Sequence, residues 1–235
     1  MKISISNLAP ENVKNFVFLG EAGCGKSELA INLAKLLLRE GNLPVHMFDL
    51  DMTKPLFRSR DKAKDLEDQG IIFHFEEQFY DAPTSGGGVN VSLANKEQYS
   101  ILDVGGDFIG ARQIGAYAPF LNRDDTRIYY MINNYRPWSA DIDHIDAVLG
   151  QTLGVSHLQL ERIHIVANPN LGPSTSLDDV LWGYKQIDNM ISPYKPIDFV
   201  CVEEGLCSGA EKALADKEVP ILPITRNLAY PWDEK

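Results

Sequence analysis

Residues 16–34, FVFLGEAGCGKSELAINLA, contain the pattern on which the fold assignment rests. An apolar run leads into an eight-residue G-x-x-x-x-G-K-S frame, Gly20 to Ser27, and a helical pattern follows. In such a frame the glycines let backbone N–H groups point at phosphate oxygens, and the helix start adds its positive dipole end. A strand, this loop and a helix in succession therefore predict a phosphate-binding loop. The alternative is a structural glycine turn.

The rest of the chain alternates short apolar runs with helical patterns. Alternation of this kind indicates a mostly parallel sheet flanked by helices on both faces, an α/β fold. We expect residues 1–235 to form a single domain, with one loop-like stretch at 81–90 and a solvated helix face at 58–65. The predicted strands are 14–20, 44–51, 70–75, 99–107, 127–134, 162–170, 197–202 and 219–224, and the predicted helices are 26–40, 108–121, 139–151, 175–190 and 208–216.

Composition restricts the possible partners and location. The chain has a net charge of −11, and a surface this acidic repels nucleic acid and anionic lipid. It contains three cysteines, too few for a disulfide framework, and the opening residues have no apolar stretch fit for a signal peptide. No run approaches the ~18 apolar residues that a membrane span requires. We therefore expect a reduced, cytoplasmic protein with no membrane anchor and no nucleic-acid partner.

Within the loop, two side chains have predicted roles. Lys26 would reach the outer phosphates, and the hydroxyl of Ser27 would ligate Mg²⁺. Acids that follow strands two and four would complete the site, because ligands bind at the carboxyl ends of parallel strands. Asp49 and Asp51 follow the second strand, and we favour Asp51 for contacting a metal-bound water or orienting the attacking water.

Asp103 ends an apolar strand in the sequence ILDVGGD, a position suited to holding Mg²⁺ through water. Gly106 completes a D-x-x-G turn whose backbone could sense the outermost phosphate. No role is fixed for Asp107. The alternative for these acids is that they are ordinary residues of turns at strand ends.

The order of phosphate loop, second-strand DLD and DVGG resembles the MinD/ParA-like branch of P-loop NTPases, near the nitrogenase-iron-protein class. That resemblance implies ATP and Mg²⁺ as cofactors, Lys26, Asp51 and Asp103 as catalytic residues, and Ser27, Asp51 and Asp103 at the metal. It also implies an adenine-reading Asn168 in IVANPN, with Asn170 as second choice, and a turn near the base at Pro223. The nucleotide contacts it implies within the loop are Gly20, Glu21, Ala22, Gly23, Cys24, Gly25, Lys26, Ser27 and Glu28.

Glu21 departs from that branch, where a lysine often stands and reaches the partner's phosphates in a nucleotide-sandwich dimer. A carboxylate cannot supply that charge, so it would be turned away from the phosphates or paired. A homodimer formed by another route remains open. Arg136 or Lys54 could supply positive charge, and the alternative is that they are solvated side chains.

The absence of a guanine-reading N-K-x-D motif favours ATP over GTP, since the Asn-Lys pair at 95–98 lacks the aspartate. The five histidines show no metal-ligand spacing, Cys201 and Cys207 are interpreted as structural thiols, and Ser139 is a predicted helix cap. We expect a slow ATPase that switches the assembly, positioning or maturation of a partner protein through segments 51–60 and 103–112. The alternatives are a small-molecule kinase or ligase that uses the 81–90 loop, a metal-insertion GTPase, and a scaffold that binds nucleotide without hydrolysis.

Overall fold

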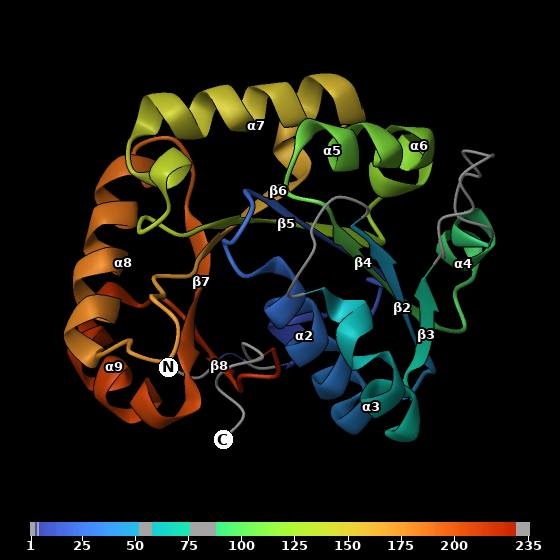
Figure 1. The fold of residues 1–235 in the computed structure, drawn as a ribbon, viewed down its shortest axis with the longest axis horizontal. Coiled ribbons are helices and arrows are strands. Elements are labelled where there is room, and N and C mark those ends of the chain that lie inside the picture. Colours follow the sequence, from blue (N-terminus) through green and yellow to red (C-terminus); the bar gives the residue numbers. More distant parts are fainter. Residues whose placement is uncertain (1–2, 4, 52–57, 76–87, 229–235) are drawn as a thin grey trace.

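Eight strands form one sheet in the computed structural model, which describes residues 3, 5–51, 58–75 and 88–228. The strand order is β3-β2-β4-β1-β5-β6-β7-β8, and every neighbouring pair is parallel (Figure 1). The strand that precedes the phosphate loop, β1, therefore lies at the centre. The strands are β1 Asn15–Gly20, β2 Val45–Leu50, β3 Ile72–Phe75, β4 Tyr99–Val104, β5 Thr126–Ile132, β6 Ile163–Ala167, β7 Ile197–Glu203 and β8 Ile221–Ile224.

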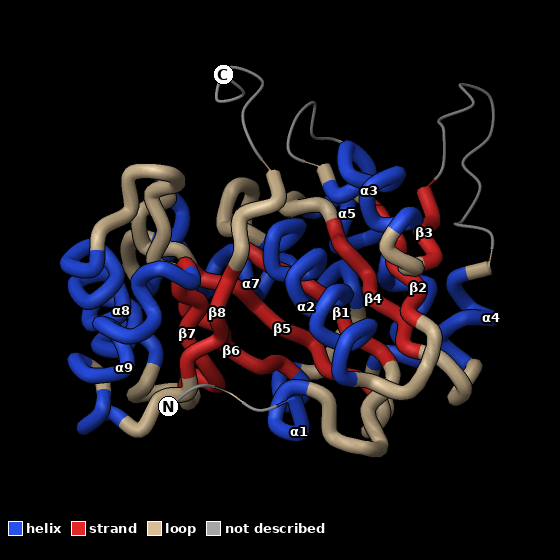
Figure 2. Tube along the Cα trace, turned by 90° about the horizontal axis from the view of Figure 1, so that it is seen from below, coloured by secondary structure: helices blue, strands red, loops and turns tan. Residues whose placement is uncertain are grey.

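Helices cover both faces of this sheet, so the fold has three layers (Figure 2). One face carries α1 Ile5–Leu8, α2 Lys26–Glu40 and α3 Ala63–Asp68. The other carries α4 Val89–Ala94, α5 Phe108–Ile114, α6 Ala118–Leu121, α7 Ile142–Ser156, α8 Leu177–Ile191 and α9 Cys207–Ala213. Short 3₁₀ turns occur at η1 Ser59–Lys62, η2 Gly115–Tyr117, η3 Pro137–Ser139, η4 Leu160–Arg162, η5 Glu204–Leu206 and η6 Ala215–Lys217.

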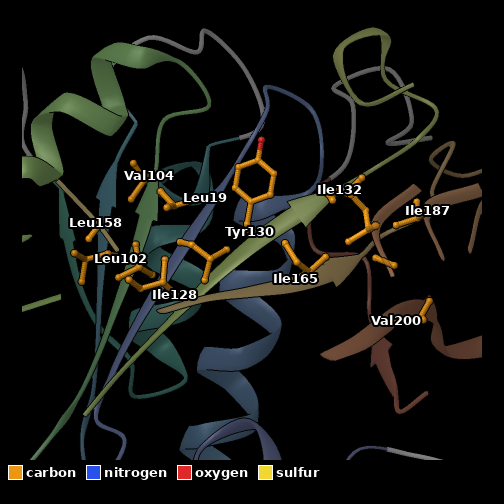
Figure 3. Packing of buried hydrophobic residues seen from close by; sticks show 14 of the residues in the cluster. Leu19, Leu102, Val104, Ile128, Tyr130, Ile132, Leu158, Ile165, Ile187 and Val200 are labelled. Carbon is orange, nitrogen blue, oxygen red and sulfur yellow. The ribbon is translucent and has the colours of Figure 1, made fainter. Parts of the chain in front are cut away.

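Each face of the sheet has its own hydrophobic cluster. Successive residues of β1 alternate between them: Val17 and Leu19 join the cluster shown in Figure 3, and Phe16 and Phe18 pack against α2. Because both faces are covered, β1 and β4 are buried along almost their whole length and most of their residues are apolar, as is typical of parallel sheets. This packing holds the carboxyl ends of the central strands together at one edge, where the loops of the site emerge.

All eight predicted strands occur, with ends shifted by a few residues. Three helical predictions need correction. The helix predicted at 108–121 is divided into α5, η2 and α6, and the one predicted at 139–151 begins at Ile142. Its cap is Asp141, which accepts from the His144 N–H at 2.9 Å, so Ser139 is not the cap.

The structure also contains elements that the sequence patterns did not reveal. These are α1 and α4, and α4 begins inside the stretch predicted as a loop at 81–90. Residues 81–87 of that stretch lie outside the described residues. None of the helices in the described part of the chain has the length and apolar character that crossing a bilayer would need.

Candidate nucleotide site

The phosphate loop connects β1 to α2 in a conformation that only glycine adopts easily. Gly20 has φ +130° and Gly25 has φ +103°, both in the left-handed region. A Cβ at Gly20 would lie 2.5 Å from the carbonyl oxygen of Met131, and one at Gly25 would lie 2.3 Å from Nδ2 of Asn168. These two glycines are therefore required by both the backbone angle and the close approach of β5 and the segment after β6.

The side chain of Lys26 folds back toward the first residues of the phosphate loop. Its side chain is buried, and Nζ donates to the carbonyl oxygens of Gly20 at 3.0 Å and Glu21 at 2.8 Å. A Cβ placed on Gly106 would lie 2.7 Å from this Nζ. The ammonium group thus lies between the phosphate loop and the turn after β4, the position from which a lysine reaches outer phosphates.

The hydroxyl of Ser27 is the clearest sign of a ligand-binding role for this loop. Ser27 is 4% exposed, and its Oγ has no hydrogen-bond partner among the described residues. Leaving a buried hydroxyl unsatisfied costs about 1–3 kcal/mol, so this hydroxyl calls for an explanation, and its place at the start of α2 suggests one. As the second residue of α2, Ser27 lies where a phosphate-bound cation would contact the helix start.

Two buried carboxylates come from the neighbouring strands. Asp103 lies within β4, and Asp51 directly follows β2. These two strands are neighbours in the sheet, and Asp49 of β2 lies opposite Asp103 of β4. The described residues hold no group of three or more His, Cys, Asp or Glu side chains that could bind a metal without other ligands. A hydroxyl and one or two carboxylates match the donors that Mg²⁺ uses when phosphates and water complete its shell, so these residues fit that ion.

Asp49 has a structural role instead. Its carboxylate accepts from Arg60 Nε at 2.7 Å, from Arg60 Nη2 at 3.2 Å and from the backbone N–H groups of Arg60 and Asp51. This pairing raises the pKa of Arg60. Arg60 also donates to the carbonyl of Asp51 at 2.7 Å. The prediction of a solvated helix face at 58–65 is therefore wrong for Arg60, which is mostly buried and fixes the backbone beside Asp51.

The D-x-x-G turn packs directly on the phosphate loop. A Cβ on Gly106 would lie 2.5 Å from the backbone nitrogen of Ala22, so no other residue fits there without movement. Asp107, whose role was open, caps α5 by accepting from the Gly110 N–H at 2.9 Å. The predicted switch segment 103–112 thus links the loop to α5. In the other segment, 51–60, residues 52–57 lie outside the described part of the chain, as does Lys54.

Glu21 is turned away from the cavity and is buried against η3. It is 6% exposed, and Ser139 Oγ donates to its Oε2 at 3.4 Å. Burial raises the pKa of the Glu21 carboxyl, an effect that Ser139 and the positive charges of Lys26 and His144 partly offset. Arg136 does not pair with this carboxylate, and its Nε donates instead to the carbonyl of Gly23 at 2.9 Å.

A cavity of about 340 Å³ extends from the loop toward β7 and β8. Its volume falls in the range of small-molecule sites. One wall comes from the loop and α2, and the other comes from the ends of β5, β7 and β8 and the segments that follow β5, β6 and β8. The lining residues are Ala22, Gly23, Gly25, Lys26, Ser27, Glu28 and Leu29 on the first, and Met131, Arg136, Asn168, Asn170, Gly172, Pro173, Cys201, Glu203, Ile224, Arg226 and Leu228 on the second.

The residues expected at the base have mixed outcomes. Asn168 lines the cavity, and its Nδ2 donates to the carbonyl of Cys24 at 2.6 Å, which fixes the orientation of the amide. Asn170 also lines the cavity, but its Oδ1 accepts from the Gly172 N–H at 2.7 Å. Pro223 lies inside β8, one residue before the part of this segment that lines the cavity.

Glu28, which was expected to contact the nucleotide, lines the cavity and also holds the segment after β8. Its Oε1 accepts from the Asn227 N–H at 2.6 Å, and its Oε2 accepts from the Leu228 N–H at 3.0 Å. Sequence reasoning missed this segment and two charged residues at the far end of the cavity, Glu203 and Arg226, which approach each other at 3.4 Å. No motif marks them, and only their positions, Glu203 at the end of β7 and Arg226 after β8, could have suggested them.

Comparison with solved structures places the fold. The chain is similar to the signal recognition particle 54 kDa protein from Aeropyrum pernix K1 in complex with GDP, with a TM-score of 0.52, 16% identity, and coverage of 81% of this chain and 42% of that one. It is also similar to the cell division protein FtsY from Thermotoga maritima, with a TM-score of 0.51, 17% identity, and coverage of 83% and 63%.

The chain spans less than two thirds of the length of either structure. No protein-family model matches it, and no curated protein matches it. At these identities the likeness concerns the fold, and the chain has the three-layer α/β fold of P-loop NTPases.

Proposed function

We propose that this chain is a Mg²⁺-dependent P-loop ATPase that acts as a nucleotide-dependent switch on a partner protein. The observation that carries the proposal is the buried Ser27 Oγ without a partner among the described residues, at the start of α2 beside Lys26. Two buried carboxylates, Asp51 just after β2 and Asp103 near the end of β4, come from the same carboxyl edge of the sheet. A purely structural glycine turn gives no reason to maintain such a hydroxyl.

In this proposal, different residues of the chain bind the phosphates, hold the metal ion and position the attacking water. Lys26 Nζ would exchange the carbonyls of Gly20 and Glu21 for phosphate oxygens, and the loop N–H groups would bind the remaining oxygens. Ser27 and Asp103 would hold Mg²⁺, which when bound neutralises the developing phosphate charge. Asp51 would position the attacking water. Such catalysis requires positioning and charge stabilisation more than covalent chemistry.

The switch would work through the turn after β4. Gly106 lies so close to Ala22 N and Lys26 Nζ that an outermost phosphate bound there would press on it. The turn leads straight into α5, whose first residues, Phe108 and Ile109, are exposed apolar side chains. A shift of this helix start would present them differently to a partner protein, and the motif order shared with MinD/ParA-like ATPases supports such a role. A second copy of the chain is one candidate partner.

The base is proposed to be adenine. Nδ2 of Asn168 uses one of its two hydrogens to donate to the carbonyl of Cys24. The acceptor Oδ1 and the second amide hydrogen can then pair with the donor and the acceptor of adenine. The missing N-K-x-D motif also favours ATP. GTP is the second candidate, because the carboxylate of Glu203 lines the cavity and could accept from guanine, and the related 54 kDa protein was solved with GDP.

Competition binding and turnover test this proposal. Purified chain should bind ATP in Mg²⁺ more tightly than GTP and hydrolyse it slowly without partners. Lys26→Ala should abolish turnover, and Asp103→Ala should raise the Mg²⁺ requirement and lower kcat. A preference for GTP would transfer the proposal to the guanine nucleotide, and undiminished hydrolysis in both variants would contradict the assigned site. A rise in turnover with an added metabolite would instead indicate a kinase.

A further inference from the structure

Arg136 lies against the middle of the phosphate loop. It follows β5, the neighbour of β1, and its Nε donates to the carbonyl of Gly23 at 2.9 Å. Its backbone is held on both sides, since its N–H donates to Asn133 O at 2.9 Å and its carbonyl accepts from the Ser139 N–H at 3.0 Å. The guanidinium therefore starts from a fixed turn and not from a freely moving surface segment.

Contacts along the loop show which part of a nucleotide each residue would face. Gly106, on the turn that would report the outermost phosphate, approaches Ala22. Asn168, at the base end, contacts Cys24 and Gly25. Gly23 lies between them and beside Ala22, so Arg136 in the cavity wall lies toward the outer phosphates and away from the base.

The loop itself carries one negative and one positive side chain, so a further positive charge near Gly23 would help to bind phosphates. Glu21 occupies the second position of the loop with a carboxylate, and only Lys26 within the frame is positive. A guanidinium carries five N–H donors, and the bond to Gly23 is the one hydrogen bond that joins this side chain to other described residues. The remaining donors have the planar geometry that suits phosphate oxygens.

We propose that Arg136 is a catalytic arginine acting in cis, which binds the outer phosphates of the nucleotide and stabilises the charge of the transition state in place of a loop lysine. This inference rests on the proposed nucleotide function. The competing interpretation is that Arg136 only holds the loop through the carbonyl of Gly23. A clamp would affect diphosphate and triphosphate binding equally, whereas a phosphate ligand would affect the triphosphate selectively.

The experiment measures the Kd of AMPPNP and the Kd of ADP, both in the presence of Mg²⁺, and the kcat for ATP hydrolysis. It compares the full chain with three variants. If the chain prefers guanine nucleotides, GMPPNP and GDP replace AMPPNP and ADP in these measurements, and GTP replaces ATP. Arg136→Gln keeps a donor for Gly23 and removes the charge, and Arg136→Lys keeps the charge and removes the planar fork. Arg39→Ala is the matched control, because Arg39 is an exposed arginine in the last turn of α2, at the end of the helix away from the loop.

Arg136→Gln should weaken AMPPNP binding by about 10- to 100-fold, the effect of a lost charge-assisted hydrogen bond, and change ADP binding by less than about threefold. Its kcat should fall further, because a transition-state arginine contributes about 10³-fold or more. Arg136→Lys should be intermediate, and Arg39→Ala should match the parent. Equal losses for both nucleotides, or none, would overturn the inference. If the parent itself binds neither nucleotide, the proposed function fails as well.

Discussion

Ser27→Ala should increase the stability of the nucleotide-free chain while removing its response to Mg²⁺. In the structure the Ser27 hydroxyl is buried without a partner among the described residues, an arrangement that costs about 1–3 kcal/mol. Alanine is also preferred over serine within helices by about 0.5 kcal/mol. Loss of the small volume of Oγ opposes these gains, so we expect a net increase of about 1 kcal/mol, or about 2–4 °C in Tm.

Thermal unfolding in EDTA measures the first effect, and nucleotide affinity with and without Mg²⁺ measures the second. Ser156→Ala is the matched control, because Ser156 at the end of α7 is fully buried and its Oγ likewise lacks a partner among the described residues. It should stabilise the chain without altering nucleotide binding. Ser139→Ala should destabilise it by about 1 kcal/mol, because its hydroxyl donates to the buried Glu21.

Two results would refute this reasoning. A decrease in Tm of Ser27→Ala in EDTA would mean that the hydroxyl has a partner in the folded chain. Unchanged enhancement of nucleotide binding by Mg²⁺ in the variant would mean that Ser27 does not contact the ion.

Three further changes follow from the same contacts. Gly106→Ala places a Cβ 2.5 Å from Ala22 N, so calorimetry should show triphosphate binding weakened far more than diphosphate binding; equal affinities would contradict the packing. Because burial raises the pKa of Glu21 above its ordinary 4.5, its protonated form stabilises the fold at low pH and this contribution is lost as the pH rises through the folded pKa. Glu21→Gln should therefore raise Tm at about pH 8 and leave it unchanged near pH 4, and a gain at both would contradict the cause. Glu28→Ala removes the acceptor that holds Asn227 and Leu228, so limited proteolysis should cleave there sooner and both ATP and ADP should bind more weakly; an unchanged digestion pattern would contradict this role of Glu28.

The fold was predictable because its signals are local and repeated. The central parallel strands are buried on both faces and so appear as apolar runs, and the glycine frame identifies β1 among them. The short helices α1 and α4 have few turns and little periodicity, so nothing in their sequence distinguishes them from loops. The division of 108–121 does have local signals that the helical pattern overlooked, since Gly115 follows α5 and Pro119 lies in the first turn of α6.

The site was predictable only where a motif fixes a residue to a strand end. Lys26, Ser27, Asp51 and Asp103 were predicted in this way; the structure shows all four to be buried, and their roles stay predictions. The different roles of Asp49 and Asp51 follow from the ion pair between Asp49 and Arg60. Arg60 lies eleven positions from Asp49 in the chain, and no sequence pattern predicts this pairing. The same limit applies to Glu28, whose partners near the C-terminal end of the described residues are about 200 positions distant, since no spacing rule links such positions.

The central claim is that this loop binds a Mg²⁺–nucleotide complex through Lys26 and Ser27. Isothermal titration of the full chain with ATP and with GTP, in Mg²⁺ and in EDTA, tests it most directly when Lys26→Ala and Ser27→Ala are titrated alongside. The account predicts one site per chain, tighter binding in Mg²⁺ than in EDTA, loss of binding in Lys26→Ala, and loss of the Mg²⁺ enhancement alone in Ser27→Ala. Absence of binding by the parent to both ATP and GTP, or equal binding by all three proteins, would contradict it.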